Sequence, residues 1–327
     1  MACNTDLSNL SLQSFEYKNK EFPHSDIFKN KLITVCPNCG FGFLISEPSI
    51  ALINDFYQSE YRTPKSSFFI DFSRMSSLKS IDARSLGQIY LGLGHTVFNK
   101  NDVFLDLGPG SGNSFSTATL VLESPICYGI ELNVGAKEFY ERAYGAKTFQ
   151  SISQFIEEGL KAKLIILSHS LEHFSLSEIS ELMNKLKMAI APEGVIVIEV
   201  PNDDLTIFGS TRKNDSPHLL FFNQQSLIHL VTNYGFEVVA FTKVGNTRIS
   251  SFHISPIEKG VFLSFLTTYI DLVRLRALLI RVILYLFRKT FKNYDLFPKQ
   301  QNKELLKQFS QGENRDCLRL VIKFNQG

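Results

Sequence analysis

Short apolar runs that end in glycine or polar residues recur along the middle of the chain. Val103–Leu107 runs directly into a glycine-rich turn, Ile126–Ile130 ends in the acidic Glu131, and Leu164–Leu167 ends in a polar cluster. A continuous apolar run of this length is typical of a parallel strand that is buried on both faces. The pattern predicts parallel strands joined by helices, and therefore an α/β fold.

The turn after Val103–Leu107 carries glycines at alternate positions, Gly108, Gly110 and Gly112. Glycine lets the backbone bend sharply and approach a ligand, because no Cβ atom stands in the way. A glycine turn followed by a second strand with a terminal carboxylate, here Glu131, is the layout of a nucleoside-binding βαβ unit, in which the carboxylate binds the ribose hydroxyls.

Three later segments extend the sheet. Residues 192–202 predict a tight turn and a central strand that closes at Pro201-Asn202, and residues 217–239 predict a loop, a helix with Gly235 as its C-cap, and another strand. The last strand is expected at Cys317–Phe324.

Two motifs carry a family resemblance. Gly-x-Gly-x-Gly after a strand that contains Asp106 resembles motif I of the class I S-adenosylmethionine methyltransferases, whereas a dinucleotide fingerprint would need a small residue at Asn113. The segment with His169, Glu172 and His173 resembles the His-x-Leu-Glu-His segment of small-molecule methyltransferases. The resemblance covers about residues 80–250 and the last strand.

This resemblance implies a Rossmann-like seven-stranded sheet with helices on both faces, and an enzyme that transfers a methyl group from S-adenosyl-L-methionine. Asp106 and the glycines would lie under the methionine and ribose, Glu131 would hold the ribose diol, and Asn113 would reach the amino-acid part. The residues expected to bind the cofactor are Asp106, Gly108, Gly110, Gly112, Asn113, Glu131 and Ser168.

Four residues are candidates for acceptor chemistry. His169 follows the strand of the polar cluster and is the first candidate for a base, with a structural role beneath the cofactor as the alternative. Glu172 and His173 are expected to begin the next helix. His218 follows a polar loop, where it would either meet an anionic substrate or lie in solvent.

Three regions are expected. Residues 1–75 form an amino-terminal region, residues 76–254 with 313–327 form the methyltransferase domain, and residues 255–312 form a helical insertion before the last strand. The chain has 327 residues, of which 44% are hydrophobic, enough for a sizeable core.

The amino-terminal region contains Cys36-Pro-Asn-Cys39-Gly, the spacing of a zinc knuckle. Cys3 and His24 are candidates for the remaining ligands of a structural Zn²⁺, and Asp6 is a weaker one. Several sugar methyltransferases carry two such knuckles before the catalytic domain, and here the first is degraded. The alternative is a relic whose thiols are a reduced pair in a turn.

Within the insertion, residues 261–292 are apolar with arginines at seven-residue spacing, Arg274, Arg281 and Arg288. The uncharged stretches are too short for a spanning helix. Such a helix either packs within the protein or a homodimer, or lies on a membrane surface.

The formal net charge of +2 gives no argument for a nucleic-acid partner. The amino terminus lacks the pattern of a secretion signal, and five cysteines, an odd number, favour reduced thiols. A cytoplasmic location is therefore expected, with membrane association as the alternative.

Three hypotheses for the function stay open, and two of them differ in the small-molecule acceptor. The knuckle, residues 56–62 and the Glu-Val-Pro-Asn strand end resemble bacterial methyltransferases of surface-polysaccharide and nucleotide-sugar pathways. The first alternative is a quinone or lipid-linked acceptor at the membrane. The second is a non-catalytic scaffold that retains the fold.

Overall fold

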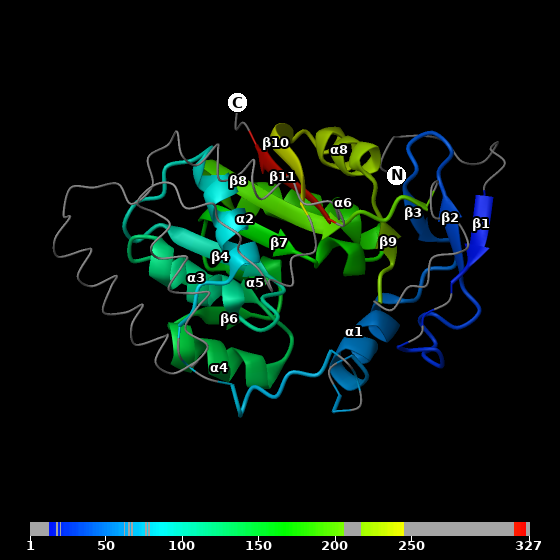
Figure 1. Cartoon of the computed structure of the whole chain (residues 1–327), viewed down its shortest axis with the longest axis horizontal. Helices are drawn as coiled ribbons and strands as arrows, with labels where there is room; N and C mark the ends of the chain where they lie inside the picture. The colour runs from blue at the N-terminus through cyan, green and yellow to red at the C-terminus, as the bar shows by residue number, and fades with distance from the viewer. Residues whose placement is uncertain are drawn as a thin grey trace, which may run out of the picture.

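Seven strands form one mixed sheet in the order β10-β11-β8-β7-β4-β5-β6 (Figure 1). The computed structural model describes residues 13–17, 19, 21–61, 63–64, 66, 68–75, 77, 79–205, 217–244 and 317–324. Strands β6, β5, β4, β7 and β8 are parallel, whereas β11 is antiparallel to both of its neighbours. The strands are β4 (Val103–Leu107), β5 (Ile126–Ile130), β6 (Lys147–Phe149), β7 (Ala162–Ser168), β8 (Ile190–Pro201), β10 (Glu237–Val244) and β11 (Cys317–Lys323).

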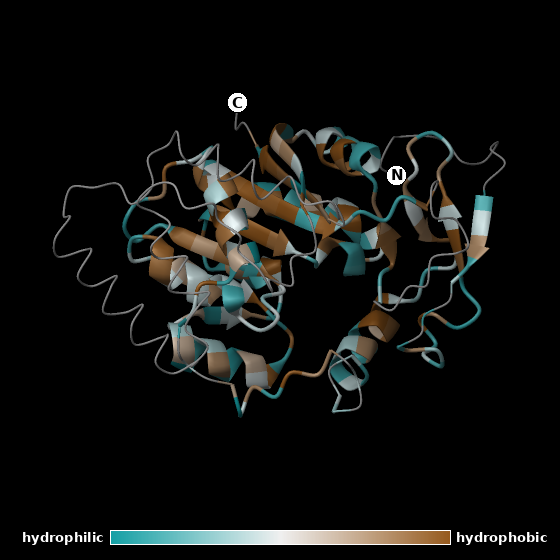
Figure 2. Ribbon diagram, viewed as in Figure 1, coloured by the Kyte–Doolittle hydropathy of each residue, from teal (hydrophilic) through white to brown (hydrophobic). Residues whose placement is uncertain are grey.

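Helices cover both faces of this sheet, and each face has its own hydrophobic core. Apolar side chains dominate the central strands, as a sheet buried on both faces requires (Figure 2). The helices on one face are α2 (Ala83–Leu93), α3 (Asn113–Val121) and α4 (Val134–Tyr144). Those on the other are α5 (Ile152–Glu157), α6 (Leu176–Ala189) and α8 (Gln224–Asn233). The predicted α/β class is confirmed.

Two local predictions need correction. Strand β8 begins at Ile190, ahead of the predicted turn. The pairing of β8 with β7 is irregular around the segment that contains Pro192, and Glu193 there has φ 55°. Glu172 and His173 do not begin a helix of the expected kind. They form the short 3₁₀ turn η1 (Leu171–His173), and α6 begins later, behind a capping box of Ser175 and Glu178.

A second, small sheet has the order β1-β2-β3-β9 and lies at one end of the molecule (Figure 1). Its strands are β1 (Gln13–Glu16), β2 (Leu32–Val35), β3 (Gly42–Leu44) and β9 (Leu220–Phe221). Helix α1 (Ile50–Ser59) packs beside it through Ile53 and Phe56 in an aromatic core. Strand β9 pairs with β3 but belongs to the segment between β8 and α8. This segment therefore joins the small sheet to the domain of the large sheet.

Strands β10 and β11 pair directly, with Val244 opposite Cys317. The residues that flank the segment 245–316 are therefore direct partners in one strand pair. The expected helical insertion at 255–312, with the apolar stretch 261–292 on which a membrane or homodimer contact was based, lies outside the described residues. Among the helices that the structure describes, none has the length and apolar character needed to cross a membrane.

Candidate active site

The glycine turn lies at the carboxyl end of β4 and adopts the predicted backbone. Gly108, Gly110 and Gly112 all have positive φ, at 79°, 60° and 76°. A Cβ atom on Gly112 would lie 2.9 Å from ring atoms of both Tyr140 and Tyr144, whereas one on Gly110 would meet nothing within 4 Å. Gly112 is therefore required by packing against α4, while Gly110 leaves open space above the turn.

Carboxylates stand at the ends of β4 and β5. Asp106 is buried, and its Oδ2 accepts a hydrogen bond from Ser114 Oγ, whereas Oδ1 has no partner among the described residues. Burial raises the pKa of Asp106 to about 7, which the bond from Ser114 opposes. Glu131 is nearly buried and its Oε1 accepts the backbone N–H of Asn133.

These features fit the expected cofactor. The orphaned oxygen on Asp106 and the glycine turn leave acceptor capacity and open space for a nucleoside with an amino-acid tail, and Glu131 at the end of β5 is the carboxylate expected to bind its ribose. Asn113 is exposed at the first turn of α3, and Ser168 at the end of β7 accepts a hydrogen bond from Gln88 Nε2 at 2.7 Å. The structure brings the seven expected residues to one edge of the sheet, and their individual roles stay predictions.

A buried polar network is centred on Glu199 of β8, which is 1% exposed. Its Oε2 accepts hydrogen bonds from Arg319 Nε at 2.6 Å and Gln88 Nε2 at 3.0 Å, and its Oε1 lies 3.4 Å from Arg84 Nε. Burial alone would raise the pKa of Glu199, but Arg319 and His169 outweigh it and hold that pKa far below its ordinary value. Glu199 is therefore a fixed negative charge at the carboxyl edge.

His169 is held between two carboxylates. Its Nε2 lies 3.3 Å from Glu199 Oε1 and its Nδ1 lies 3.4 Å from Glu172 Oε1, with Cys317 Sγ 3.8 Å from Nε2. Its backbone has φ 53°, a conformation that is costly for a non-glycine residue. Burial alone would lower the pKa of His169, but Cys317, Glu172 and Glu199 outweigh it and raise the pKa well above its usual value. This raised pKa favours the protonated form of the ring at neutral pH.

A second cluster joins Glu172, His173 and His218, whose ligand-type atoms all lie within 4.8 Å of one another. His218 comes from the segment before β9, and its Nδ1 lies 3.3 Å from Asp203 Oδ2. Its Nε2 points to the other carboxylate, 3.9 Å from Glu172 Oε1. His173 Nδ1 lies 3.1 Å from the carbonyl oxygen of Pro217 and donates to it.

Burial and neighbouring charges together set the pKa values in this cluster. Burial lowers the pKa of His173 to about 4, against the opposing attraction of Glu172, so this imidazole is neutral at physiological pH. Burial alone would raise the pKa of Glu172, but the nearby histidines outweigh it and the pKa falls below its ordinary value. The cluster thus holds a carboxylate beside a neutral ring.

The amino-terminal region reaches this cluster through aromatic side chains. Tyr57 and Tyr61, on and just after α1, lie with ring centroids 5.9 Å and 6.3 Å from that of His173. Tyr17 donates its hydroxyl to the carbonyl oxygen of His218 at 2.8 Å. Burial and neighbouring charges raise the pKa of Tyr57 well above its usual value, so its hydroxyl keeps its proton.

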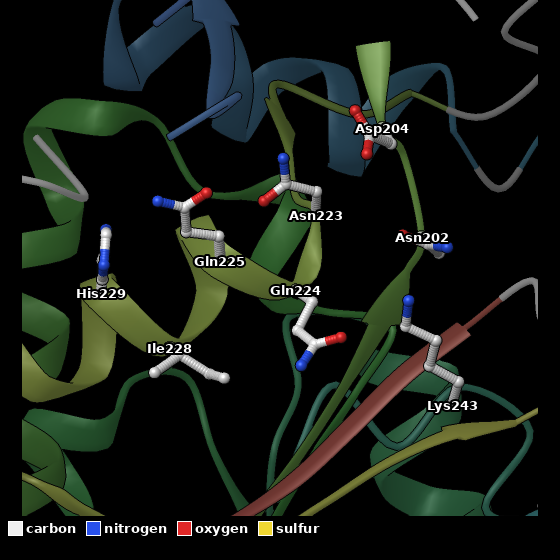
Figure 3. Close-up of a pocket in the computed structure, with 8 residues that line it drawn as sticks. All are labelled: Asn202, Asp204, Asn223, Gln224, Gln225, Ile228, His229 and Lys243. Carbon is white, nitrogen blue, oxygen red and sulfur yellow. The ribbon is translucent and has the colours of Figure 1, made fainter. Parts of the chain in front are cut away.

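A polar cavity of about 540 Å³ is lined by the segment that follows β8 together with residues of α8 and β10. Asn202 and Asp204 line it, while Asp203 between them contacts His218. Figure 3 shows the remaining lining residues on α8 and β10, and apart from Ile228 all of them are polar or charged. They are Asn223, Gln224, Gln225, Ile228, His229 and Lys243.

Cys36 and Cys39 lie in the predicted knuckle turn, in which Gly40 has φ 70° and donates its N–H to the carbonyl oxygen of Cys36. Both cysteines are buried in the core that they share with α6 and α8. Of the other two candidate ligands, His24 is exposed and Cys3 lies outside the described residues. In the part of the chain that the structure describes, no group of three metal-type ligands includes either knuckle cysteine.

Sequence reasoning missed several members of the site: Gln88, Glu199, Asp203, Tyr57, Tyr61 and Arg319. For two of them a signal exists. Glu199 interrupts the apolar run of β8 and Arg319 that of β11. A charge within a buried strand needs a partner, and each of these two is the other's.

Residues 81–240 match the family model described as a methyltransferase domain. No curated protein matches the chain.

Several solved structures resemble it. An S-adenosylmethionine-dependent methyltransferase from Archaeoglobus fulgidus is 17% identical, with 74% of this chain and 94% of that chain covered and a TM-score of 0.41. One from Geobacter sulfurreducens in complex with S-adenosyl-L-homocysteine is 12% identical, with 84% and 98% covered and a TM-score of 0.40. The cyclopropane synthase MmaA2 from Mycobacterium tuberculosis is 11% identical, with 78% and 92% covered and a TM-score of 0.44.

Proposed function

We propose that this S-adenosylmethionine-dependent methyltransferase, whose residues 81–240 match the methyltransferase-domain model, acts on a hydroxyl-rich small molecule of the nucleotide-sugar or glycan-precursor class. The observation that carries this proposal is the histidine cluster, together with an amide-rich cavity whose lining residues Asn202 and Asp204 flank Asp203, the partner of His218. A base and a polar binding surface are what methylation of a sugar needs.

The cofactor supplies a sulfonium methyl group that is already activated, so the protein's task is to align the acceptor with it. Gly108, Gly110 and Gly112 admit the cofactor to the backbone, and Glu131 binds its ribose hydroxyls. The 3₁₀ turn η1 approaches the same place, since a Cβ on Gly108 would lie 3.3 Å from Ser170 Cβ, one residue before η1. The acceptor thus lies between the glycine turn and the cluster.

We assign the proton transfer to His218. Asp203 holds its Nδ1, so Nε2 is the nitrogen that takes the proton from the acceptor as the new bond to the methyl carbon forms. The pair of Asp203 and His218 is thus a base with an orienting carboxylate. His169, the first candidate on sequence grounds, is already protonated between two carboxylates and fits an orienting role better.

The cavity supports a hydroxyl-rich acceptor. Amide side chains donate and accept hydrogen bonds at once, which matches the hydroxyl groups of a sugar, and Lys243 and Asp204 add one charge of each sign. The segment 202–204 connects the two places, because Asn202 and Asp204 line the cavity while Asp203 between them contacts His218. The resemblance to sugar methyltransferases points the same way.

The test is a methyl-transfer assay with S-adenosylmethionine and a panel of acceptors: nucleotide hexoses, lipid-linked saccharides and quinols. Turnover of nucleotide hexoses supports the proposal, and turnover of quinols alone, stimulated by anionic vesicles, establishes the membrane alternative instead. His218→Gln should lower kcat at least about 100-fold and leave cofactor affinity unchanged. His95→Gln is the matched control, because His95 follows α2 next to Thr96, which bonds the Glu193 carbonyl near the start of β8, away from the cluster and the cavity, and it should not lower kcat to that extent.

We further propose that Cys36 and Cys39 provide two thiolates to a structural Zn²⁺, whose other ligands would come from Cys3 and His24. Zinc content of the purified protein, measured against a Cys36→Ser/Cys39→Ser variant, tests this. Equal zinc in both proteins contradicts the proposal.

A further inference from the structure

Glu172 is a buried carboxylate that lacks hydrogen bonds. The residue is 1% exposed, and neither of its side-chain oxygens receives a hydrogen bond from any residue that the structure describes. The nearest cationic group is the ring of His169, whose Nδ1 lies 3.4 Å from Oε1 as an ion pair. A carboxylate taken out of water is costly unless it is hydrogen-bonded, paired or bound to a metal. One ion pair leaves most of its acceptor capacity unused.

The two histidines beside it are oriented as metal ligands are. The Nδ1 of His173 donates to the Pro217 carbonyl oxygen at 3.1 Å, and the Nδ1 of His218 lies 3.3 Å from Asp203 Oδ2. A ring whose Nδ1 carries the proton has its lone pair on Nε2. Metal-binding histidines almost always donate their other N–H to a carboxylate or backbone carbonyl in this way.

The geometry therefore points to a divalent metal site: we propose that Glu172, His173 and His218 bind a first-row divalent cation of the zinc type. Their ligand atoms already lie within 4.8 Å of one another. Around a tetrahedral zinc these atoms would be about 3.3 Å apart. His218 Nε2 and Glu172 Oε1 are 3.9 Å apart, so a small rotation of the carboxylate, which no hydrogen bond restrains, brings these two atoms to the separation of zinc ligands.

A neighbouring cluster of similar composition does not compete. His169, Glu199 and Cys317 also lie within 4.8 Å of one another. There, however, the carboxylate of Glu199 is occupied by the guanidinium of Arg319, with Arg84 nearby. A second cation would have to displace or approach these positive charges, which is unfavourable in a buried place. Glu172 has His169 as a cationic neighbour at Oε1, but its Oε2 accepts no hydrogen bond from any described residue, so the comparison favours the cluster whose carboxylate has free acceptor capacity.

The site has a consequence for the proposed function, and this step rests on it. Two imidazoles and one carboxylate leave coordination positions open, as in catalytic zinc sites. An acceptor hydroxyl bound at an open position would lose its proton to water more readily, because the cation lowers its pKa. With a cation bound, His218 would be one of its ligands, and the cation would supply the activation of the acceptor oxygen that is otherwise assigned to His218.

Binding of Co²⁺ to the full chain tests the inference apart from methyl transfer. The background is Cys36→Ser/Cys39→Ser, so that the knuckle contributes no thiolate, and the protein is stripped with a chelator before titration. The expected result is one Co²⁺ per chain with visible d–d bands and no thiolate charge-transfer band. Glu172→Gln and His173→Ala should each weaken binding at least about 100-fold, while His95→Gln, outside both the cluster and the cavity, should leave it unchanged.

Folding of each variant is checked by circular dichroism and by binding of S-adenosylhomocysteine. If Glu172→Gln does not fold, His173→Ala carries the comparison, since His173 is only half-buried. Equal Co²⁺ affinity in wild type and His173→Ala overturns the inference. So does a thiolate band that disappears in Cys317→Ser, because it places the metal in the other cluster. Methyl transfer that continues with a chelator and without Co²⁺ binding also overturns it, yet leaves the proposed function intact with His218 as the base.

Discussion

Arg319 Nε lies 2.6 Å from Glu199 Oε2, although 120 residues separate the two positions. Both side chains are buried, on the adjacent antiparallel strands β11 and β8. The positive charge of the guanidinium balances the negative charge of Glu199, whose carboxylate also contacts His169 and Gln88. One ion pair therefore stabilises the polar network at the carboxyl edge of the sheet.

Arg319→Met should destabilise the protein by about 3–5 kcal/mol, because it leaves the Glu199 charge buried without its main partner. Arg84→Met is the matched control: Arg84 is one-third exposed at 3.4 Å from the same carboxylate, and its loss should cost at most about 1 kcal/mol. Urea unfolding followed by circular dichroism measures both. Adding Glu199→Gln to Arg319→Met should recover part of the loss, and no recovery would contradict the assigned pairing.

The glycines of the turn should separate into two classes. Gly110→Ala places a Cβ in open space at φ 60°, at a cost of about 1–2 kcal/mol from backbone strain, and should weaken cofactor binding because the new methyl group faces the ligand side. Gly112→Ala adds contacts at 2.9 Å with two tyrosine rings, which should cost a further 1–3 kcal/mol or so. Thermal unfolding with calorimetric titration of S-adenosylhomocysteine checks both. Equal loss of stability in the two variants would contradict this division.

Glu131→Gln should weaken binding of S-adenosylmethionine by about 30- to 100-fold. The proposed contact consists of charge-assisted hydrogen bonds to the ribose, each worth about 1.5–3 kcal/mol. Glu138→Gln on the exposed side of α4 is the control and should bind normally. Isothermal titration calorimetry of the folded variants gives the comparison, and unchanged affinity in Glu131→Gln would remove this residue from the ribose site.

Stability should fall with rising pH through the titration of Asp106. Its pKa is about 7 in the folded protein and 3.8 as the ordinary value, so the folded state binds the proton more tightly than the unfolded state. This contribution is fully present below pH 3.8 and is lost as the pH rises toward and through 7. The difference is at most about 4 kcal/mol, from about 1.4 kcal/mol per pKa unit.

Asp106→Asn removes this titration. The free energy of unfolding of wild type minus that of Asp106→Asn should therefore decrease between pH 5 and pH 8 in urea titrations. A difference that does not change over this range would show that Asp106 is ionised throughout.

The local parts of this molecule were predictable from sequence. The strand Val103–Leu107, its glycine turn and Glu131 depend on a short apolar run and on backbone conformations that glycine alone adopts freely, so neighbouring residues determine them. The start of β8 could not be predicted in this way, because Pro192 suggests a turn and only the pairing with β7 shows that the strand continues across it.

The acceptor side of the site was predictable only in part. His169, Glu172 and His173 are close in sequence, but the Asp203–His218 pair and the approach of Tyr57 to His173 are set by how separate segments pack. A sequence shows that a buried charge needs a partner without showing which residue supplies it. The assignment of His169 as the first candidate for a base failed to anticipate Glu199, whose negative charge changes the protonation of that ring.

The direct pairing of Val244 with Cys317 makes β10 and β11 a hairpin in three dimensions, whatever length of chain joins them. Entry and exit of the connecting segment are neighbours, so lengthening or replacing it leaves the strand register, and with it the Arg319–Glu199 pair, in place. In evolutionary terms this is a permissive junction, at which a methyltransferase of this architecture could gain, exchange or lose a module while the sheet and its carboxyl edge are inherited unchanged.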